Sequence, residues 1–583
     1  MCGIIGIINK SNKAVDPEIL KRMSNKIAHR GPDSDGIYIS DNKRIGLAHR
    51  RLSLVDISSR GNQPMSKHNL VIVFNGEIYN FREIRKELES FGYTFTSSSD
   101  TEVILSAFDK WKIGCLDKFN GPFAFILYDQ KNSEIFIARD RLGEKPLYYT
   151  QISDTILAAS EIKALAQYPG VTLSPNLNRI KMDLIFNFWA DKEESYFEGI
   201  NSVQPGFYIR VNSLGVHKIK YWDLIAENNL AKIDMSRTKI NTYVENMYEL
   251  LVEATKMRIN ADVGIGSMLS GGVDSSLITT IAAKYSSNPI ECFTLFHENS
   301  DDEDYKCAQL LEKEIPNIVD YPVPIRKESF TVDKIDYIIN QMEEVLLDKI
   351  YVYVNNNYKQ AKKHGLKTVI NGQGSDEITL GYYKYYAFMQ SEPISFEKDN
   401  FIKFWCDQYF LKEYTDKNNV MDLVIHNLEK AYFPYMSNDL LNSVSIFGIK
   451  THLLGLLAQE DKLSMSEGVE CRTVFTDYRF AEEFVKIPSI IKILDGREKY
   501  LIREIAKKIL PSEIVNREKL GFPNFDDRSN EIINEIINDP DFRKSKIINS
   551  IVSKKMFDNI DKLPDGKRWK LANLFRFEKV FFS

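Results

Sequence analysis

The chain has 583 residues, about four times the length of a typical domain, so more than one domain is expected. Its 76 lysines and arginines against 81 aspartates and glutamates give a net charge of −5, which excludes the basic excess that nucleic-acid binding needs. An apolar fraction of 43% excludes a disordered chain. The six cysteines lie far apart without a CxxC pair, too sparse for a disulfide scaffold, so we expect a cytoplasmic protein.

No segment of the sequence is expected to enter a membrane. The most apolar long stretch, Val444–Ala458, contains Lys450 and His452 and is too short to span a bilayer. The apolar run Cys2–Ile8 has no positive region before it and no cleavage site after it, so a secretory signal is not expected. We therefore expect neither nucleic acid nor membrane as a partner, and a homodimer is compatible with the sequence.

The first 205 residues are rich in predicted strands. Short β-prone runs bounded by turn residues occur at Gly3–Ile8, Leu70–Phe74, Phe123–Tyr128 and Ile135–Ala138, and the last two predict a hairpin that turns at Gln130–Ser133. Between the runs, apolar residues at helical spacing predict two helices. The first carries Phe81, Ile84, Leu88 and Phe91 and stops at Gly92, and the second carries Val103, Ile104, Ala107, Phe108 and Trp111.

The rest of the chain has a different pattern. After a polar stretch at Glu227–Lys239, predicted helices alternate with predicted strands, which is typical of a parallel α/β sheet. The helices are Tyr243–Met257 and Leu277–Tyr285, and the strands are Val263–Leu269, Cys292–Phe296 and Thr368–Asn371. From about Ser395 onward the pattern is mostly helical. We predict a first domain over 2–205, a connector over 206–240 and a second domain with a helical extension over 241–583.

Cys2 is a candidate nucleophile. Removal of the methionine before it would leave a free α-amine, with a typical pKa near 8, on the same residue as the thiol. Such an amine can act as general base for its neighbouring nucleophile. The alternative is a cysteine buried in a strand.

Three further segments suit a site around Cys2. Asn75 and Gly76 follow a β-run and could form an oxyanion hole or an ordinary turn. Arg51 could hold a carboxylate with two hydrogen bonds or lie in solvent. Asp100 could cap the helix that follows it or bind a substrate ammonium group.

Together these segments resemble the class II glutamine amidotransferases, whose catalytic residue is an N-terminal nucleophile. The ordered motifs are Cys2-Gly3-Ile4, Arg30-Gly31-Pro32-Asp33, His49-Arg50-Arg51-Leu52-Ser53, Asn75-Gly76-Glu77, Ser99-Asp100-Thr101-Glu102, Arg139-Asp140-Arg141-Leu142-Gly143 and Pro146-Leu147-Tyr148. The resemblance implies an αββα sandwich in which Cys2 attacks the side-chain amide of glutamine and releases ammonia. Asn75 and Gly76 would hold the oxyanion, Arg51 the glutamine α-carboxylate, and Glu77 and Asp100 its α-amine.

A second site is indicated by the loop Ser270–Ser276, which follows a predicted strand and opens a helix. Small residues there let backbone N–H groups approach a phosphate. Gly272 stands where a Walker loop needs lysine, and Leu269 where a dinucleotide fingerprint needs its third glycine, so both motifs are excluded. A plain glycine turn is the remaining alternative.

The loop resembles the pyrophosphate loop of the ATP pyrophosphatases, and Asn371–Glu377 resembles the second signature of that domain. The resemblance implies Mg²⁺ held by Asp274 and Asp376, and Lys499 neutralising developing charge; on sequence alone, Lys499 also fits a solvated helix. The implied ATP-binding residues are Leu269, Ser270, Gly271, Gly272, Asp274, Ser275, Leu295, Asn371 and Gly372.

Nearly the whole chain resembles the glutamine-hydrolysing asparagine synthetases. These combine an N-terminal-nucleophile domain with an α/β pyrophosphate-loop domain of the adenine nucleotide alpha-hydrolase type. The resemblance implies that ATP activates aspartate as β-aspartyl-AMP, releasing pyrophosphate, and that ammonia from the first site passes through an internal tunnel and displaces AMP. The substrates would be glutamine, aspartate and ATP.

Two departures from the family pattern bear on the acceptor. Gln373 takes the place of the first glutamate in Gly-Glu-Gly-Ser-Asp-Glu, a catalytic position. The pattern Glu-x-Arg-x-Pro-Phe-Leu-Asp appears as Glu470–Asp477 without its proline and leucine. We expect both to lie in the acceptor half, so the alternative is a related ligase that amidates another carboxylate, such as a sugar acid or a natural-product intermediate. If aspartate remains the acceptor, Glu470 or water could replace the missing base.

Two further hypotheses place the protein outside these amide ligases. A protein that keeps the fold for storage or assembly is disfavoured by the intact Cys2, Asp274 and Asp376. Sugar-phosphate or phosphoribosyl amidotransferases share the first domain but carry a different second one, so the loop at 270–276 distinguishes them.

Overall fold

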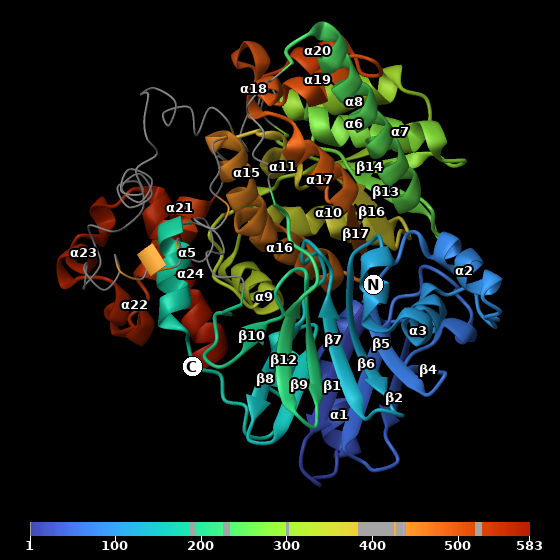
Figure 1. Ribbon diagram of the computed structural model, residues 1–583. Helices are drawn as coiled ribbons and strands as arrows, with labels where there is room; N and C mark the ends of the chain where they lie inside the picture. The colour runs from blue at the N-terminus through green and yellow to red at the C-terminus, as the bar shows by residue number, and fades with distance from the viewer. Residues whose placement is uncertain are drawn as a thin grey trace.

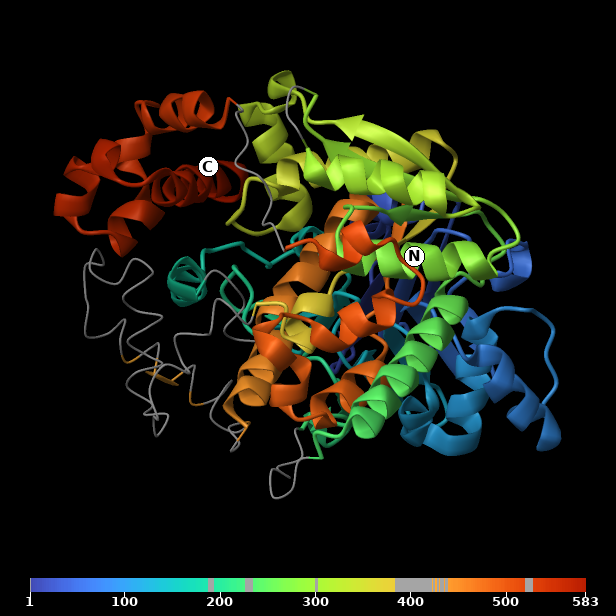
Figure 2. The ribbon, with the colours of Figure 1, turned by 90° about the horizontal axis from the view of Figure 1, so that it is seen from above.

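The computed structural model describes residues 2–186, 193–225, 234–298, 302–382, 439–518 and 528–583, with five single residues between 421 and 436. In Figure 1 the first domain forms the lower part of the molecule and the second the upper part. Figure 2, viewed from above, shows the C-terminal helices, among them α21 (Ser529–Ile537) and α24 (Asp565–Phe582), to one side of the second domain.

The first domain is built on two antiparallel sheets of six strands each. One has the order β10-β8-β9-β1-β3-β2, made of Asn201–Ser202, Tyr148–Ile152, Thr155–Ala159, Cys2–Asn9, Ile45–Arg51 and Ser34–Ile39. The other has the order β12-β11-β7-β6-β5-β4, made of Gly215–Lys220, Phe207–Asn212, Glu134–Arg139, Phe123–Asp129, Leu70–Gly76 and Met65–Lys67. The predicted hairpin is confirmed, because β6 and β7 pair antiparallel up to Asp129 and Glu134.

The two sheets pack face to face with helices outside them. Ile4 of β1 and Val73 of β5 belong to one buried cluster between the sheets. Helices α2 (Phe81–Ser90) and α3 (Asp100–Trp111) cover the outer face of the sheet that holds β5, and α1 (Pro17–Lys26) packs on β1 and β3. β1 is therefore buried on both faces, which explains its unbroken apolar run. The αββα sandwich implied by the sequence is confirmed.

The first domain continues past residue 205. Strands β11 and β12 fall within the range 206–240 expected as a connector, and β11 pairs with β7 from Tyr208 to Val211. Strand β12 is hard to predict because none of its residues is buried and Val216 and Ile219 are its only strongly apolar side chains. Helix α6 (Arg237–Arg258) likewise begins within that range. Residues 226–233 lie outside the described part of the chain.

The second domain holds a parallel sheet of five strands in the order β15-β14-β13-β16-β17. They are Ile318–Pro324, Ile290–Phe296, Ile265–Met268, Thr368–Asn371 and Glu470–Thr473. Each neighbouring pair is parallel, as the alternating pattern predicted. Strand β17 was not predicted, since the sequence beyond 395 was taken as helical.

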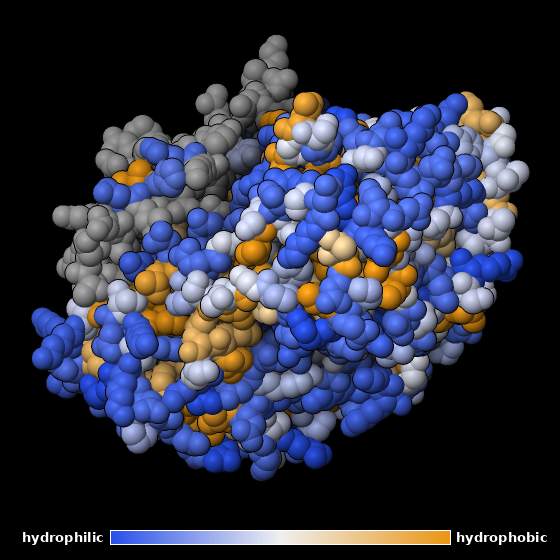
Figure 3. Space-filling model, turned by 90° about the horizontal axis from the view of Figure 1, so that it is seen from below, coloured by the Kyte–Doolittle hydropathy of each residue, from blue (hydrophilic) through white to orange (hydrophobic). Residues whose placement is uncertain are grey.

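Helices flank this sheet. Among them are α7 (Val273–Tyr285), α10 (Tyr351–Lys363), α15 (Leu440–Lys450) and α16 (His452–Ser466). The stretch Leu441–Ser466 is long and apolar enough to cross a membrane by composition, but 83% of its most apolar window is buried inside the protein, as in a core helix. On the face seen from below, hydrophilic side chains predominate and apolar ones form small islands (Figure 3).

Candidate active sites

Cys2 lies at the start of β1, buried in the first domain. The side-chain oxygen of Asn75 accepts a hydrogen bond from the Cys2 backbone nitrogen at 2.9 Å. That contact orients the Asn75 amide, and its Nδ2 is a buried donor without a partner among the described residues. An amide nitrogen held in this way, next to the thiol, suits the oxyanion of an attacked amide. Burial raises the pKa of the Cys2 thiol, so the thiolate needs a nearby base.

The residues predicted around Cys2, apart from Asn75, line one small cavity of about 40 Å³. Arg51, Gly76, Glu77 and Asp100 lie on its wall together with Cys2. They come from β3, β5, the turn after β5 and the start of α3. Gly76 has φ +139°, and a Cβ there would lie 2.1 Å from the Pro122 carbonyl oxygen, so only glycine fits.

Arg51 and Asp100 are held by the protein around this cavity. The Arg51 guanidinium donates to the Ser58 carbonyl oxygen at 2.8 Å and to Asn62 Oδ1 at 2.7 Å, so it is not solvated. Asp100 does not cap α3, because Ser99 accepts the capping bond from the Thr101 nitrogen. Burial raises the pKa of Asp100 to about 6, and a hydrogen bond from the Ile78 backbone nitrogen partly opposes this rise.

Glu77 has a partner that sequence reasoning missed. Arg472 Nη2 of β17, in the second domain, lies 2.5 Å from Glu77 Oε2. Arg472 also donates to Glu470 Oε1 at 2.9 Å. Burial raises the pKa of Glu77, and the Arg472 charge opposes that rise. The second domain thus forms part of the surroundings of the first site.

The Glu470–Asp477 motif lies in the second domain, the acceptor half in which we expected it. Glu470–Thr473 form β17 beside β16, and the Val474 backbone nitrogen donates to the Asn371 carbonyl oxygen at 3.4 Å. Neither Val474 nor Thr476 lines the cavity that holds Gln373. Glu470 pairs with Thr368 at the start of β16, whereas Gln373 follows the end of that strand, so Glu470 is at the wrong edge of the sheet to serve as a base there. The location of this motif could not be predicted because β17 has only four residues and its partners, in β16 and in the first domain, are far away in the sequence.

The second site lies at the carboxyl edge of the parallel sheet, where α/β folds commonly bind ligands. Ser270–Gly272 joins β13 to α7, and Gly271 has φ +68° with its Cα close to the Asp304 carbonyl, where a Cβ would come within 2.0 Å. Ser275 Oγ accepts from the Ser270 nitrogen at 3.2 Å and closes the loop. The tight turn of the loop therefore needs glycine at position 271.

Two adjoining cavities open beside this loop, of about 340 Å³ and 310 Å³. The first is lined by Ser270, Gly272, Asp274, Asp376 and Lys499 among others. The second is lined by the remaining predicted residues except Gly271, which shapes the turn: Leu269, Ser275, Leu295, Asn371, Gly372 and Gln373. Both share Ser270, Asp274 and Asp376.

Asp274 and Asp376 converge on Lys499, so the solvated-lysine alternative is excluded. Lys499 Nζ forms an ion pair with Asp274 and lies 2.6 Å from Asp376 Oδ1. Burial alone would lower the pKa of Lys499, but the two carboxylates raise it above its usual value. Two partly exposed carboxylates beside a phosphate-type loop fit a Mg²⁺ ion that takes its other ligands from phosphate and water.

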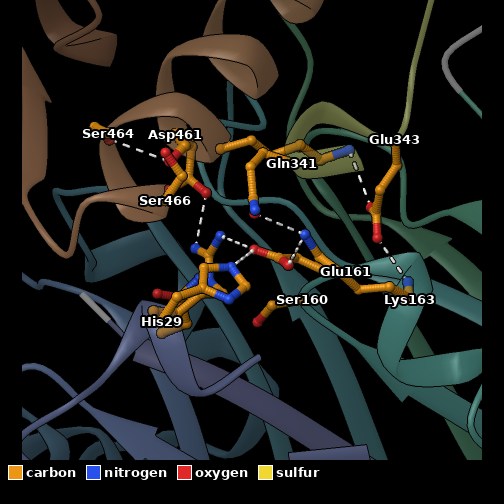
Figure 4. Close-up of polar contacts among 12 residues, drawn as sticks. His29, Ser160, Glu161, Lys163, Gln341, Glu343, Asp461, Ser464 and Ser466 are labelled. Carbon is orange, nitrogen blue, oxygen red and sulfur yellow. Dashed lines mark hydrogen bonds and ion pairs between the residues drawn. The ribbon is translucent and has the colours of Figure 1, made fainter. Parts of the chain in front are cut away.

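Buried charges cross the boundary between the two domains. Arg30 Nη2 lies 2.7 Å from Asp461 Oδ2 of α16, and Arg30 Nη1 lies 2.9 Å from Glu161 Oε1. Arg30 Nε also donates to the Cys2 carbonyl oxygen at 3.1 Å. Glu343 accepts hydrogen bonds from the Ile162 and Lys163 backbone nitrogens at the start of the short helix after β9 (Figure 4). The network joins the first site to a helix that reaches the second.

Two family descriptions match the chain. A glutamine amidotransferase domain matches residues 1–222, and asparagine synthase matches residues 246–580. The chain is 29% identical over 566 residues to asparagine synthetase [glutamine-hydrolyzing] 1 of Bacillus subtilis, covering 90% of this chain and 87% of that protein.

Two further relatives are another asparagine synthetase and a protein named an amidase. Asparagine synthetase [glutamine-hydrolyzing] 3 of Bacillus subtilis is 28% identical, over 96% of this chain and 93% of that protein. Amidase chry2 of Gibberella zeae is 31% identical, over 67% of this chain and 61% of that protein. The chain therefore belongs to the asparagine synthase family, and it joins a class II glutamine amidotransferase domain to an asparagine synthase domain.

Proposed function

We propose that this enzyme makes asparagine from aspartate, with ATP as the activating substrate and glutamine as the nitrogen source. The observation that carries the proposal is the convergence of Asp274 and Asp376 on Lys499, in cavities that continue to Gln373. That arrangement supports attack of a carboxylate on ATP, with loss of pyrophosphate. The asparagine synthetases among the relatives support aspartate as the acceptor.

In the first half-reaction Cys2 attacks the glutamine amide, and its α-amine, freed of Met1, takes the thiol proton. Asn75 Nδ2 donates to the developing oxyanion, because Asn75 Oδ1 is already bound to the Cys2 nitrogen. Arg51 binds the glutamine α-carboxylate, and Asp100 and Glu77 bind its α-amine. The C–N bond then breaks, the α-amine returns the proton to the leaving nitrogen, and ammonia departs. Hydrolysis of the resulting thioester yields glutamate.

In the second half-reaction the loop 270–275 offers backbone N–H groups to the phosphates, and Lys499 faces the charge that develops on them. Mg²⁺, when bound by Asp274 and Asp376, supplies further positive charge against the triphosphate. The carboxylate is thereby converted to an acyl-adenylate. AMP leaves this adenylate more readily than oxygen leaves a free carboxylate, and ammonia takes the place of AMP.

A second acceptor class is favoured by one observation. Among the described residues that line the cavity with Gln373, His297 is the only basic side chain. Aspartate carries a second carboxylate, for which arginine or lysine would be the usual partner. The second candidate is therefore amidation of a carboxylate that lacks this second negative group.

Pyrophosphate release tests both candidates. The purified enzyme is given ATP, Mg²⁺ and one carboxylate at a time, with aspartate first and with glutamine or ammonium chloride as nitrogen source. Mass spectrometry identifies the amide. Aspartate-dependent release with asparagine as product supports the first candidate. Release with another carboxylate alone supports the second, and release with none contradicts the proposed function.

A further inference from the structure

The amide-forming step leaves a proton that needs an acceptor. Ammonia has one proton more than the amide nitrogen can keep, and Gln373 cannot take it because a neutral amide is no base near pH 7. Resting on the proposed function, we infer that Glu460 of α16 takes this proton. Glu460 lies outside the sequence motifs that indicate the two active sites, and Glu470 lies at the opposite edge of the sheet.

Glu460 lines the same cavity as Gln373. It lies one helical turn beyond Leu456, and both side chains face that cavity together with Tyr351 of α10. The helix holds them there because its other faces are buried: Leu457, Ala458 and Leu463 all lie in the core. Glu460 is therefore fixed on a rigid element that lines the cavity of Gln373.

The next residue shows on which side of the cavity Glu460 lies. Asp461 faces the first domain and binds Arg30, which in turn contacts the Cys2 carbonyl oxygen. Figure 4 shows Asp461 on its helix above the Glu161 cluster of the first domain. Helix α16 thus runs between the two sites, and Glu460 lies on the side from which nitrogen released at Cys2 would arrive.

The chemistry of Glu460 suits a base at neutral pH. Burial raises the pKa of Glu460 to about 7, and a hydrogen bond with Cys471 of β17 opposes the rise. The Tyr351 phenol also interacts with Glu460, and burial keeps the pKa of that phenol well above its usual value. A base whose pKa lies near the working pH is the most effective one for proton transfer.

The step balances as follows. The nitrogen lone pair of ammonia forms the C–N bond to the acyl carbon of the adenylate. The bond from that carbon to the phosphate oxygen breaks, and its electron pair leaves with AMP. The extra proton on nitrogen passes to the Glu460 carboxylate, which later returns it to water.

The experiment separates the two halves of the synthetase reaction in Glu460→Gln. Acceptor-dependent ATP–pyrophosphate exchange measures adenylate formation, and ammonia-dependent amide formation measures the next step. We expect exchange to stay within about threefold of wild type, while amide formation falls by about 10²-fold or more, the usual contribution of a general base. Expressed per un-ionised ammonia, the wild-type rate should rise as pH passes through about 7, and the variant should lose this rise.

Two further variants act as controls. Glu467→Gln changes a carboxylate just beyond the end of α16 that does not line the cavity, and we expect both rates to be retained. The double variant Glu460→Gln/Gln373→Glu returns a carboxylate to the cavity from the other side, and we expect partial recovery of amide formation. Recovery also shows that the Glu460 variant folds.

Each contrary outcome overturns the inference. If exchange and amide formation fall together, Glu460 binds the acceptor instead of the proton. Unchanged amide formation, or a retained pH rise, removes Glu460 from proton transfer. If the wild-type enzyme shows no exchange with any carboxylate, the proposed function fails and the inference fails with it, so the two failures are told apart by the exchange measurement.

Discussion

Arg472 Nη2 of the second domain lies 2.5 Å from Glu77 Oε2 in the cavity of the first. Both side chains are buried, so their charges interact strongly. Glu470, on the same strand, shares Arg472 with Glu77. A change in the second domain is therefore expected to alter the binding of glutamine in the first.

Arg472→Gln tests this contact. Without the guanidinium, the buried Glu77 becomes protonated more readily and holds the glutamine ammonium group less well, so we expect KM for glutamine to rise about tenfold or more. Glutaminase assays measure this directly. Ammonium-dependent synthesis should change less, and Arg472→Lys, which keeps a positive charge, should lie between. An unaltered KM in Arg472→Gln would contradict the role of the pair.

Cys2→Ala should abolish glutamine-dependent synthesis and leave synthesis from ammonium salts. The reason is that Cys2 serves only the first of two separable half-reactions. Retention of Met1 should have the same effect because it blocks the α-amine, and mass spectrometry of the chain detects it. Cys115→Ala changes a buried cysteine that lines none of the three cavities; it is the control and should keep both activities. Glutaminase activity in Cys2→Ala would exclude Cys2 as nucleophile.

Asp274→Asn and Asp376→Asn should each stop pyrophosphate release while glutamine hydrolysis persists. Each removes one of the carboxylates that would hold Mg²⁺, and each leaves Lys499 with one ion-pair partner. Pyrophosphate release at varied Mg²⁺ concentration is the measurement. Rates within a few-fold of wild type at low Mg²⁺ would show that these carboxylates do not bind the metal.

The pH dependence of glutamine use should reflect Asp100. Its pKa is raised to about 6 by burial, and only its charged form attracts an ammonium group. As pH falls through about 6 the carboxyl becomes neutral, so KM for glutamine should rise on the acid side. Asp100→Asn should have a high KM that changes little between pH 5 and 7. If wild type and variant show the same acid limb, another group is responsible.

The buried ion pair between Arg30 and Asp461 should matter more for stability than the half-exposed pair between Lys367 and Asp33. Asp461→Ala leaves Arg30 with one carboxylate fewer in a site where both side chains are at most 2% exposed. We expect a loss of about 3–5 kcal/mol, seen as a lower Tm. Lys367→Ala, whose side chain is 37% exposed, should cost about 0–1 kcal/mol. Equal shifts would contradict this ranking.

The elements with strong local patterns were predictable from the sequence. The strand at Thr368–Asn371 has the predicted bounds, because a short apolar run there ends at the glycine-rich signature. Helix α7 begins at Val273, four residues earlier than predicted, because the loop Ser270–Gly272 leads directly into it. Cys2, Arg51 and Asp100 come together in one cavity even though they are far apart in the chain.

What the sequence could not show depends on partners from the other domain. Strand β17 is fully buried although it carries the charged residues Glu470 and Arg472. Charged residues do not predict a core strand, and Arg472 can be buried here because Glu77 of the first domain neutralises it. Glu460 occupies one position of a mostly apolar helix, and no spacing distinguishes it from a surface glutamate. Its place at the cavity follows only from the packing of α16 between the domains.

The position of β17 also limits how such enzymes can be recombined. A four-residue strand completes one edge of the parallel sheet and, through Arg472, contributes to the glutamine cavity of the other domain. Fusing the first 222 residues to an unrelated synthetase domain would expose Glu77 to water and remove its counter-charge, Arg472. A productive chimera would have to carry residues 470–477 along with the glutaminase half, although some 250 residues separate the two in the chain. The unit of exchange is therefore an interface, and it does not coincide with either domain.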